Sequence, residues 1–211
     1  GDLSRQTDGK GLPEMLTLEV VQKLDAGFRF SNEEGSFPFR GQSLSFPLLS
    51  EVLNRYSNPM IITVQSNVVD VHKKLIELLK GQSKLPTILI HSDYDIILQT
   101  IKNHEPHWAV GLGRAELTRS FMMNSLFLEP AMTLSGDLFI SSGFQRSQPI
   151  VTDSLFKELN RRRLEVYLSD INTENELVWA MNHPVAAILT ERPTFIYRLI
   201  LTKLAQTPQS E

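Results

Sequence analysis

The hydrophobic pattern of the chain changes near residue 47. Before that point, glycines and turn-forming residues interrupt the sequence, and only the stretch 16–25 carries apolar residues at helical spacing. Apolar mass without a regular period comes from Phe28, Phe30, Phe37 and Phe39. We therefore expect residues 1–46 to form a compact, mostly irregular subdomain that is held together by aromatic side chains.

From residue 47 onward, short apolar runs alternate with stretches of helical period. The apolar runs predict strands at 59–64, 87–90, 108–112, 137–140, 164–168 and 185–189. The amphipathic stretches predict helices at 47–56, 68–80, 95–104, 115–128, 153–162, 174–182 and 193–204. The last residues, 206–211, are polar and predict a frayed tail.

Successive strand–helix units of about 25 residues predict a parallel sheet that is covered by helices. A doubly wound sheet and a (β/α)8 barrel both agree with this alternation. A barrel needs eight units and about 250 residues, whereas residues 47–205 supply six units. An open arc of six strands would expose unpaired edges and an apolar interior.

Composition narrows the classes of function. The 211 residues include 21 Lys and Arg, 24 Asp and Glu, and no Cys, and 41% are hydrophobic, which is typical of a soluble globular chain. The near balance of charge argues against a dedicated nucleic-acid binder or a binder of anionic membranes. Without Cys, the chain has no disulfide, no thiolate catalysis and no Cys-ligated metal. No apolar run approaches the roughly 18 residues of a membrane span, and the polar start does not resemble a signal peptide, so the compartment stays open.

Both α/β architectures place their chemistry at the C-terminal ends of the strands. Acidic residues follow three of these ends, at Asp93, Asp170 and Glu191, and each is equally typical of a helix N-terminus. A hard cation needs converging carboxylates, which these ends do not obviously supply. His91 is the best single candidate for acid–base work, and the alternative interpretation is a polar side chain that is satisfied at the top of the sheet.

Short motifs recur in order along the whole chain. They are LSRQTDGKG at 3–11, LDAGF at 24–28, FPFRG at 37–41, FPLLSEVL at 46–53, VYLSDIN at 166–172 and AAILTERP at 186–193. In order and spacing they resemble the glycerophosphodiester phosphodiesterase family, with its L-x-R-T-T-[ND]-G-x-G, I-P-T-L-E-E-V-L, V-W-T-V-N and G-I-I-T-D-R-P segments. The resemblance implies a (β/α)8 TIM barrel, with residues 1–46 as the insertion subdomain and residues 47–205 as units three to eight of one domain.

The resemblance also implies an activity: hydrolysis of glycerophosphodiesters to an alcohol and glycerol 3-phosphate, assisted by Mg²⁺ or Ca²⁺. In the family, two histidines and a carboxylate pair lie in H-R-G, E-x-D and H-D motifs, and these precede the segment that matches Leu3 to Gly11. We therefore expect the catalytic histidines to lie upstream of Gly1, and we expect residues 1–211 alone to be inactive. The implied partner is a glycerophosphodiester-like small molecule, not a nucleic acid.

Several positions of the implied site are altered. The metal-binding Glu of the family's E-I-K strand becomes Thr63, and its phosphate-binding Lys becomes Gln65. The Trp of V-W-T-V-N becomes Ser169, and Glu191 replaces the Asp of T-D-R-P. The candidates for the substrate pocket are Gln65, His91, Ser92, Ser169 and Glu191, with Thr63 as a degenerate metal position.

Two hypotheses follow from the altered positions. The chain belongs to an enzyme whose remaining site residues lie elsewhere, or it is a catalytically inactive relative that uses the barrel mouth for binding. A scaffold that binds a partner through the open arc is a third interpretation. The sequence does not specify the head group, the metal or the oligomeric state.

Overall fold

The computed structural model describes residues 2–32, 34–66, 68, 70–82 and 85–206. The chain forms two compact units, Gly1–Met60 with Gln65–Thr87 and Ile61–Val64 with Ile88–Glu211. The boundary expected at residue 46 stays a prediction. Of the expected tail, Gln206 ends the last helix, and 207–211 lie outside the described residues.

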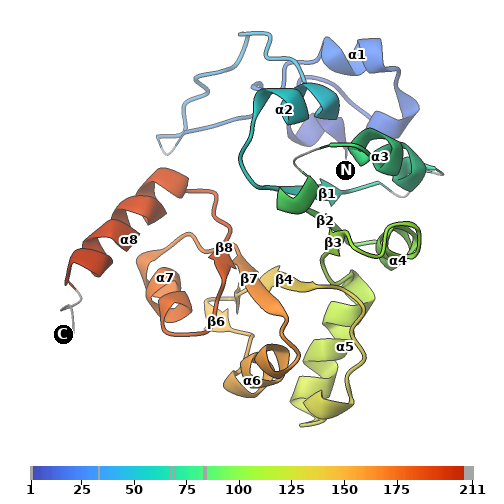
Figure 1. The fold of residues 1–211 in the computed structure, drawn as a ribbon. Coiled ribbons are helices and arrows are strands. Elements are labelled where there is room, and N and C mark those ends of the chain that lie inside the picture. The colour runs from blue at the N-terminus through green and yellow to red at the C-terminus, as the bar shows by residue number, and fades with distance from the viewer. Residues whose placement is uncertain (1, 33, 67, 69, 83–84, 207–211) are drawn as a thin grey trace. The chain divides into compact units, whose positions relative to one another are not determined.

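The first unit is mostly irregular (Figure 1). Its elements are η1 (Leu3–Arg5), η2 (Pro13–Met15), α1 (Leu18–Gln22), α2 (Leu49–Arg55), α3 (Val71–Leu79) and η3 (Leu85–Thr87). The helix expected at 16–25 is thus shorter, since a 3₁₀ turn precedes Thr17 and a turn begins at Lys23.

A buried carboxylate organises the irregular segment. Asp25 Oδ1 accepts from the Gly27 N–H at 3.0 Å, and Oδ2 accepts from the Gly41 N–H at 2.7 Å. The Asp25 N–H donates to Asp8 Oδ1 at 2.9 Å. These bonds join three stretches that are distant in sequence, and the bond to Gly27 satisfies a buried backbone donor.

The aromatic side chains contribute less burial to this segment than expected. Phe30 and Phe39 lie with ring centroids 5.1 Å apart, and the Arg40 guanidinium lies 3.7 Å from the Phe37 ring centroid. All three phenylalanines are at least 40% exposed. The hydrogen bonds of Asp25 therefore hold this segment together alongside the aromatic contacts.

The second unit contains the regular strand–helix alternation (Figure 1). Its first strand is β1 (Met60–Val64), of which Ile61–Val64 belong to this unit. The next elements are β2 (Ile88–Ser92), α4 (Asp95–His104), β3 (Ala109–Val110), α5 (Arg114–Ser125), η4 (Glu129–Ala131) and β4 (Leu138–Ser142). It continues with β5 (Phe144–Gln145), β6 (Gln148–Pro149), α6 (Asp153–Arg161), β7 (Glu165–Ser169), α7 (Glu174–Met181), β8 (Ala187–Ile188) and α8 (Pro193–Gln206). The predicted strands and helices are present, while the antiparallel β5–β6 pair was not predicted.

The strands follow one another in chain order. One sheet has the order β1-β2-β3 and the other β4-β7-β8, and a parallel bridge between Gly111 and Leu138 joins them. The pairs β2–β3, β4–β7 and β7–β8 are parallel. A doubly wound sheet requires a reversal of strand order, and this sheet has none. The fold is therefore of the (β/α)8 type, with six strand–helix units, as predicted.

Alternation along each strand gives the arc two different faces. The outer face packs against the helices in the main apolar core, which includes Phe139 on β4 and Leu168 on β7 with Leu155 and Leu159 on α6. The inner face carries a smaller apolar cluster of Leu89, Leu138 and Ile140, which packs with Ile61, Ala109 and Tyr167. The outer side chains of the strands thus form the main core with the helices, and the inner side chains form the smaller cluster.

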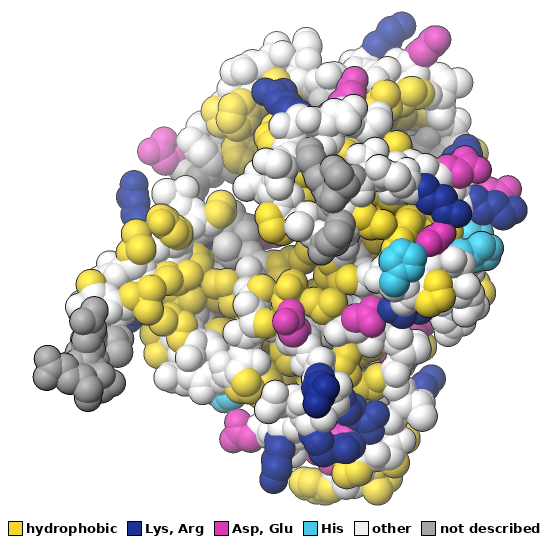
Figure 2. Space-filling model, in the orientation of Figure 1, with side chains coloured by type: hydrophobic (Ala, Val, Ile, Leu, Met, Phe, Trp, Pro, Cys, Tyr) yellow, Lys and Arg dark blue, Asp and Glu magenta, His cyan; other side chains and the backbone are white. Residues whose placement is uncertain are grey.

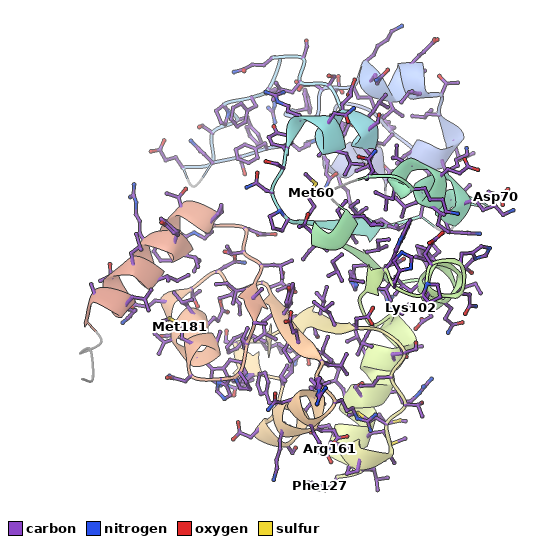
Figure 3. The ribbon with its side chains drawn as sticks, in the orientation of Figure 1. Met60, Asp70, Lys102, Phe127, Arg161 and Met181 are labelled. Carbon is purple, nitrogen blue, oxygen red and sulfur yellow. The ribbon has the colours of Figure 1, made fainter. Side chains whose placement is uncertain are left out.

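A half-buried ion pair connects α4 to the starts of β3 and β4. Lys102 Nζ donates to Asp137 Oδ2 at 2.7 Å and to the Trp108 carbonyl at 3.0 Å, and Figure 3 shows the position of Lys102. Asp137 Oδ2 also accepts from the Val110 N–H at 2.9 Å. The pair therefore satisfies backbone groups at the N-terminal side of the arc.

A second cluster of charge lies at the end of α6. The buried Glu158 carboxylate accepts from Arg161 Nη2 at 2.7 Å and from Arg162 Nε at 2.6 Å. The Arg161 guanidinium, with Arg162 beside it, lowers the pKa of Glu158 to about 2. Arg162 Nη2 also donates to the Pro130 carbonyl at 3.0 Å, which joins α6 to η4.

We predict that Glu158→Gln lowers the free energy of unfolding at neutral pH by about 3 kcal/mol, because a buried ion pair loses one partner. Since the pKa is lowered in the folded state, this stabilisation is complete above the ordinary value of 4.5 and is lost as the pH falls towards about 2. Urea denaturation of both proteins across this pH range measures the difference.

The matched control is Glu174→Gln, whose half-exposed carboxylate pairs with Lys203. An exposed pair contributes less than about 1 kcal/mol, so this change has a small effect. A deficit of Glu158→Gln that stays constant down to pH 2 would contradict the role given to the ion pair.

Candidate functional site

The inner face of the arc changes from apolar to polar towards the C-terminal ends of the strands. Side chains two positions apart on a strand share a face. The positions that follow the inner apolar cluster by two residues, and therefore share the inner face, are Thr63, His91, Gly111, Ser142 and Ser169. Ser142 and Ser169 are register partners of β4 and β7. These five positions, called here the polar layer, form the candidate functional site.

His91 lies against Gly111 of the neighbouring strand. A Cβ atom added at Gly111 would lie 2.9 Å from His91 Nδ1 and 3.5 Å from Ile140 Cδ1. Glycine is therefore required for the imidazole to take this position. His91 Nδ1 is buried without a hydrogen-bond partner, so Nε2 is the nitrogen through which the ring can reach a ligand.

Burial lowers the pKa of His91 from its ordinary value of 6.5, and the Asp93 carboxylate partly opposes this shift. The physical cause is that a charged imidazolium would bury an unpaired Nδ1–H. At neutral pH the ring is therefore neutral, with one nitrogen that donates and one that accepts. A neutral imidazole can orient a phosphate ester or transfer a proton near neutral pH.

Ser92 faces the other side of the sheet from His91 and is fully buried. Its hydroxyl donates to the Val64 carbonyl at 2.8 Å and accepts from the Tyr94 N–H at 3.1 Å. The structure therefore uses this side chain to fasten β1 to the start of the loop after β2. This arrangement does not bring Ser92 together with the polar layer.

Thr63 and Gln65 are both exposed, at the end of β1 and directly after it. Both side chains are neutral, so neither supplies the charge that a divalent cation or a phosphodiester would attract. Within the described ranges, no group of three or more His, Cys, Asp or Glu side chains is placed to hold a metal ion. These residues thus do not fit a cation site.

The ends of β7 and β8 are fixed by local hydrogen bonds. The Ser169 hydroxyl donates to Asp170 Oδ2 at 2.8 Å. Asn172 Oδ1 accepts from the Thr190 hydroxyl and from the Glu191 N–H, both at 2.9 Å. Glu191 is exposed and its backbone is held, so the loop places this carboxylate at the C-terminal end of β8.

Similarity to known proteins agrees with this geometry. No family model matches the chain. A glycerophosphodiester phosphodiesterase from Caldanaerobacter subterraneus is 29% identical over 116 residues, which cover 52% of this chain and 45% of that protein. The solved glycerophosphoryl diester phosphodiesterase domain of an uncharacterised Mycobacterium tuberculosis protein has a TM-score of 0.78, with 14% identity, 95% of this chain and 80% of that chain covered.

A third similar protein is an Oleispira antarctica phosphodiesterase, solved in complex with the product sn-glycerol-3-phosphate. Its TM-score is 0.66, with 21% identity and coverage of 94% of this chain and 76% of that chain. The chain is thus similar in sequence to a glycerophosphodiester phosphodiesterase and shares the fold of solved phosphodiesterases. It spans less than half the length of the curated relative that it matches in sequence.

This similarity confirms the resemblance seen in the sequence. The sequence identified His91 and Ser169 as candidates. It did not reveal the close approach of His91 to Gly111 or the hydrogen bonds by which Asn172 holds the end of β8. The signal for Gly111 was present, since a glycine in a buried strand marks a close approach of another group. Nothing in the sequence indicated which group approaches it.

We predict that the Cε1 proton of His91 titrates in NMR spectra below the usual range of histidine, because its charged form is desolvated. Asp93→Asn removes the opposing carboxylate and lowers this pKa further. A His91 pKa at or above the value of an unfolded peptide would contradict the burial of Nδ1.

Proposed function

We propose that the polar layer binds a glycerophosphodiester, and that residues 1–211 do so without hydrolysing it by themselves. The observation that carries this proposal is the half-buried His91, whose ring is held against Gly111 on the inner face where α/β barrels bind substrates. The Oleispira antarctica relative, which binds sn-glycerol-3-phosphate, supports the choice of ligand class.

His91 contacts a nonbridging phosphate oxygen through Nε2–H, and Thr63 offers a hydroxyl on the neighbouring strand. Ser169 and Glu191 lie at the ends of β7 and β8, where the alcohol side of the ligand is bound. Ser92 holds β1 in register with β2 and acts on the ligand only through that position. Neutral groups bind a phosphodiester weakly, because none of them compensates its charge.

Hydrolysis to an alcohol and glycerol 3-phosphate is a second candidate, which the similarity to a glycerophosphodiester phosphodiesterase favours. His91 alone supplies one acid–base group, whereas cleavage of a diester requires one group to activate the nucleophile and another to protonate the leaving alkoxide. Among the described residues, no group of three or more His, Cys, Asp or Glu side chains is placed to hold a divalent cation.

We predict that glycerophosphocholine binds residues 1–211 in a calorimetric titration and that His91→Gln weakens binding by about tenfold, since one hydrogen bond to a charged oxygen is lost. The matched control is His107→Gln, because the His107 side chain is 74% exposed before β3 at the opposite end of the strands. Equal loss in both variants would contradict the proposed site.

The release of glycerol 3-phosphate separates binding from hydrolysis. We expect no Mg²⁺- or Ca²⁺-dependent release by residues 1–211, and release by this chain would overturn the binding-only proposal. Thr63→Glu combined with Gln65→Lys restores the charges of the family motif. If this double variant gains affinity for the cation, measured without substrate, the loss of cation binding is assigned to these two positions.

A further inference from the structure

An exposed apolar turn follows α5, at the end of the second unit that is opposite the polar layer. Leu126, Phe127 and Leu128 are 58%, 85% and 48% exposed, and Met122, one helical turn earlier, is 52% exposed. We call these four residues the apolar tip. Figure 3 shows Phe127 at the lower end of the view, and Figure 2 shows hydrophobic side chains gathered there.

The backbone holds this turn in a defined shape. The Leu128 N–H donates to the Met123 carbonyl at 2.8 Å, and the Phe127 N–H donates to the Asn124 carbonyl at 3.1 Å. These two bonds form a Schellman motif, in which the residue at the position of Phe127 adopts left-handed backbone angles. Phe127 has a φ of +58°, so the helix was predicted to end three residues too late.

Phenylalanine is an unfavourable choice at this position. Glycine normally occupies it, and an L-residue with a side chain costs about 1 kcal/mol there. The exposed ring gains nothing from burial in the folded chain. Neither stability nor solubility accounts for an aromatic residue that is both strained and 85% exposed, which points to a contact with something outside the chain.

Positive charge adjoins the tip. Arg162 Nη2 donates to the carbonyl of Pro130, two residues beyond Leu128. The Arg161 side chain is 62% exposed beside it, and Arg162 and Arg163 follow directly after the end of α6 at Arg161. Figure 2 shows Lys and Arg side chains next to the hydrophobic side chains at this end, and Figure 3 places Arg161 close to Phe127 in the view.

We propose that the apolar tip inserts into the interfacial region of a phospholipid membrane, with the exposed edge of the Arg161 guanidinium facing lipid phosphates. A short convex turn with an aromatic residue at its apex and arginines behind it suits shallow insertion, because the apolar side chains reach the acyl boundary while guanidinium groups stay among the headgroups. The net charge of -3 is a sum over the whole chain and does not describe this surface. No helix among the described residues is long and apolar enough to span a bilayer.

Cosedimentation of residues 1–211 with phosphatidylcholine vesicles, with and without phosphatidylglycerol, tests the proposal. We expect binding to both, stronger with phosphatidylglycerol. Phe127→Asn weakens binding by about tenfold, because the apex side chain no longer leaves water. Asn tolerates left-handed backbone angles, so this variant keeps or raises the melting temperature, which shows that the lost binding is not a loss of fold.

The matched control is Tyr197→Asn on α8, where the replaced aromatic side chain is 62% exposed. We expect this variant to bind vesicles like the unaltered chain, and equal loss in both variants would overturn the proposal. Failure of the unaltered chain to cosediment with either vesicle would also overturn it. If sedimentation without lipid shows that Phe127→Asn abolishes self-association, the tip is a contact between copies, and the membrane proposal fails.

Discussion

The parallel register of the strands determines where every side chain of the second unit points. Each strand must pair its backbone N–H and C=O groups with its neighbours, and the side chains then alternate between two faces. The bridge from Gly111 to Leu138 carries this register from one sheet to the other, since the Leu112 N–H donates to the Leu138 carbonyl at 2.8 Å. A shift of one residue at this junction would exchange the inner and outer faces of the strands beyond it.

This constraint explains why the candidate site is polar but poor in charge. The positions that follow the inner apolar cluster carry Thr63, His91, Gly111, Ser142 and Ser169, and none of them is ionised near neutral pH. Other charged groups of the unit form pairs away from this face, as in the pair of Lys102 with Asp137 and the cluster around Glu158. The chain thus keeps the fold of the phosphodiesterases that it resembles, and the inner face of its strands carries neutral groups.

Much of the fold follows from the sequence because its patterns are local. The capping box of Thr173 and Glu176 predicts the start of α7, and the Glu176 carboxylate does accept from the Thr173 N–H at 3.0 Å. The predicted end of α5 was wrong because a Schellman motif is normally recognised in a sequence by its glycine, and here Phe127 occupies that position. The β5–β6 pair is too short to give a periodic signal.

The site was less predictable than the fold. The sequence identifies the strand ends and therefore His91, but it does not say which face each hydroxyl takes. Ser92 and Ser169 are the same residue type at comparable strand ends, and only the register shows that Ser92 fastens β1 whereas Ser169 lies on the inner face. The contact between His91 and Gly111 involves two neighbouring strands, and such a contact is not visible in a single sequence.

The central claim is that the inner face of the parallel arc is the binding face. Amide chemical-shift mapping of residues 1–211 with glycerophosphocholine tests it most directly. The account predicts that the shifted amides belong to Thr63, His91, Gly111 and Ser169, while amides of the outer helices stay unchanged. Shifts confined to the helices, or shifts at the N-terminal ends of the strands, would contradict it.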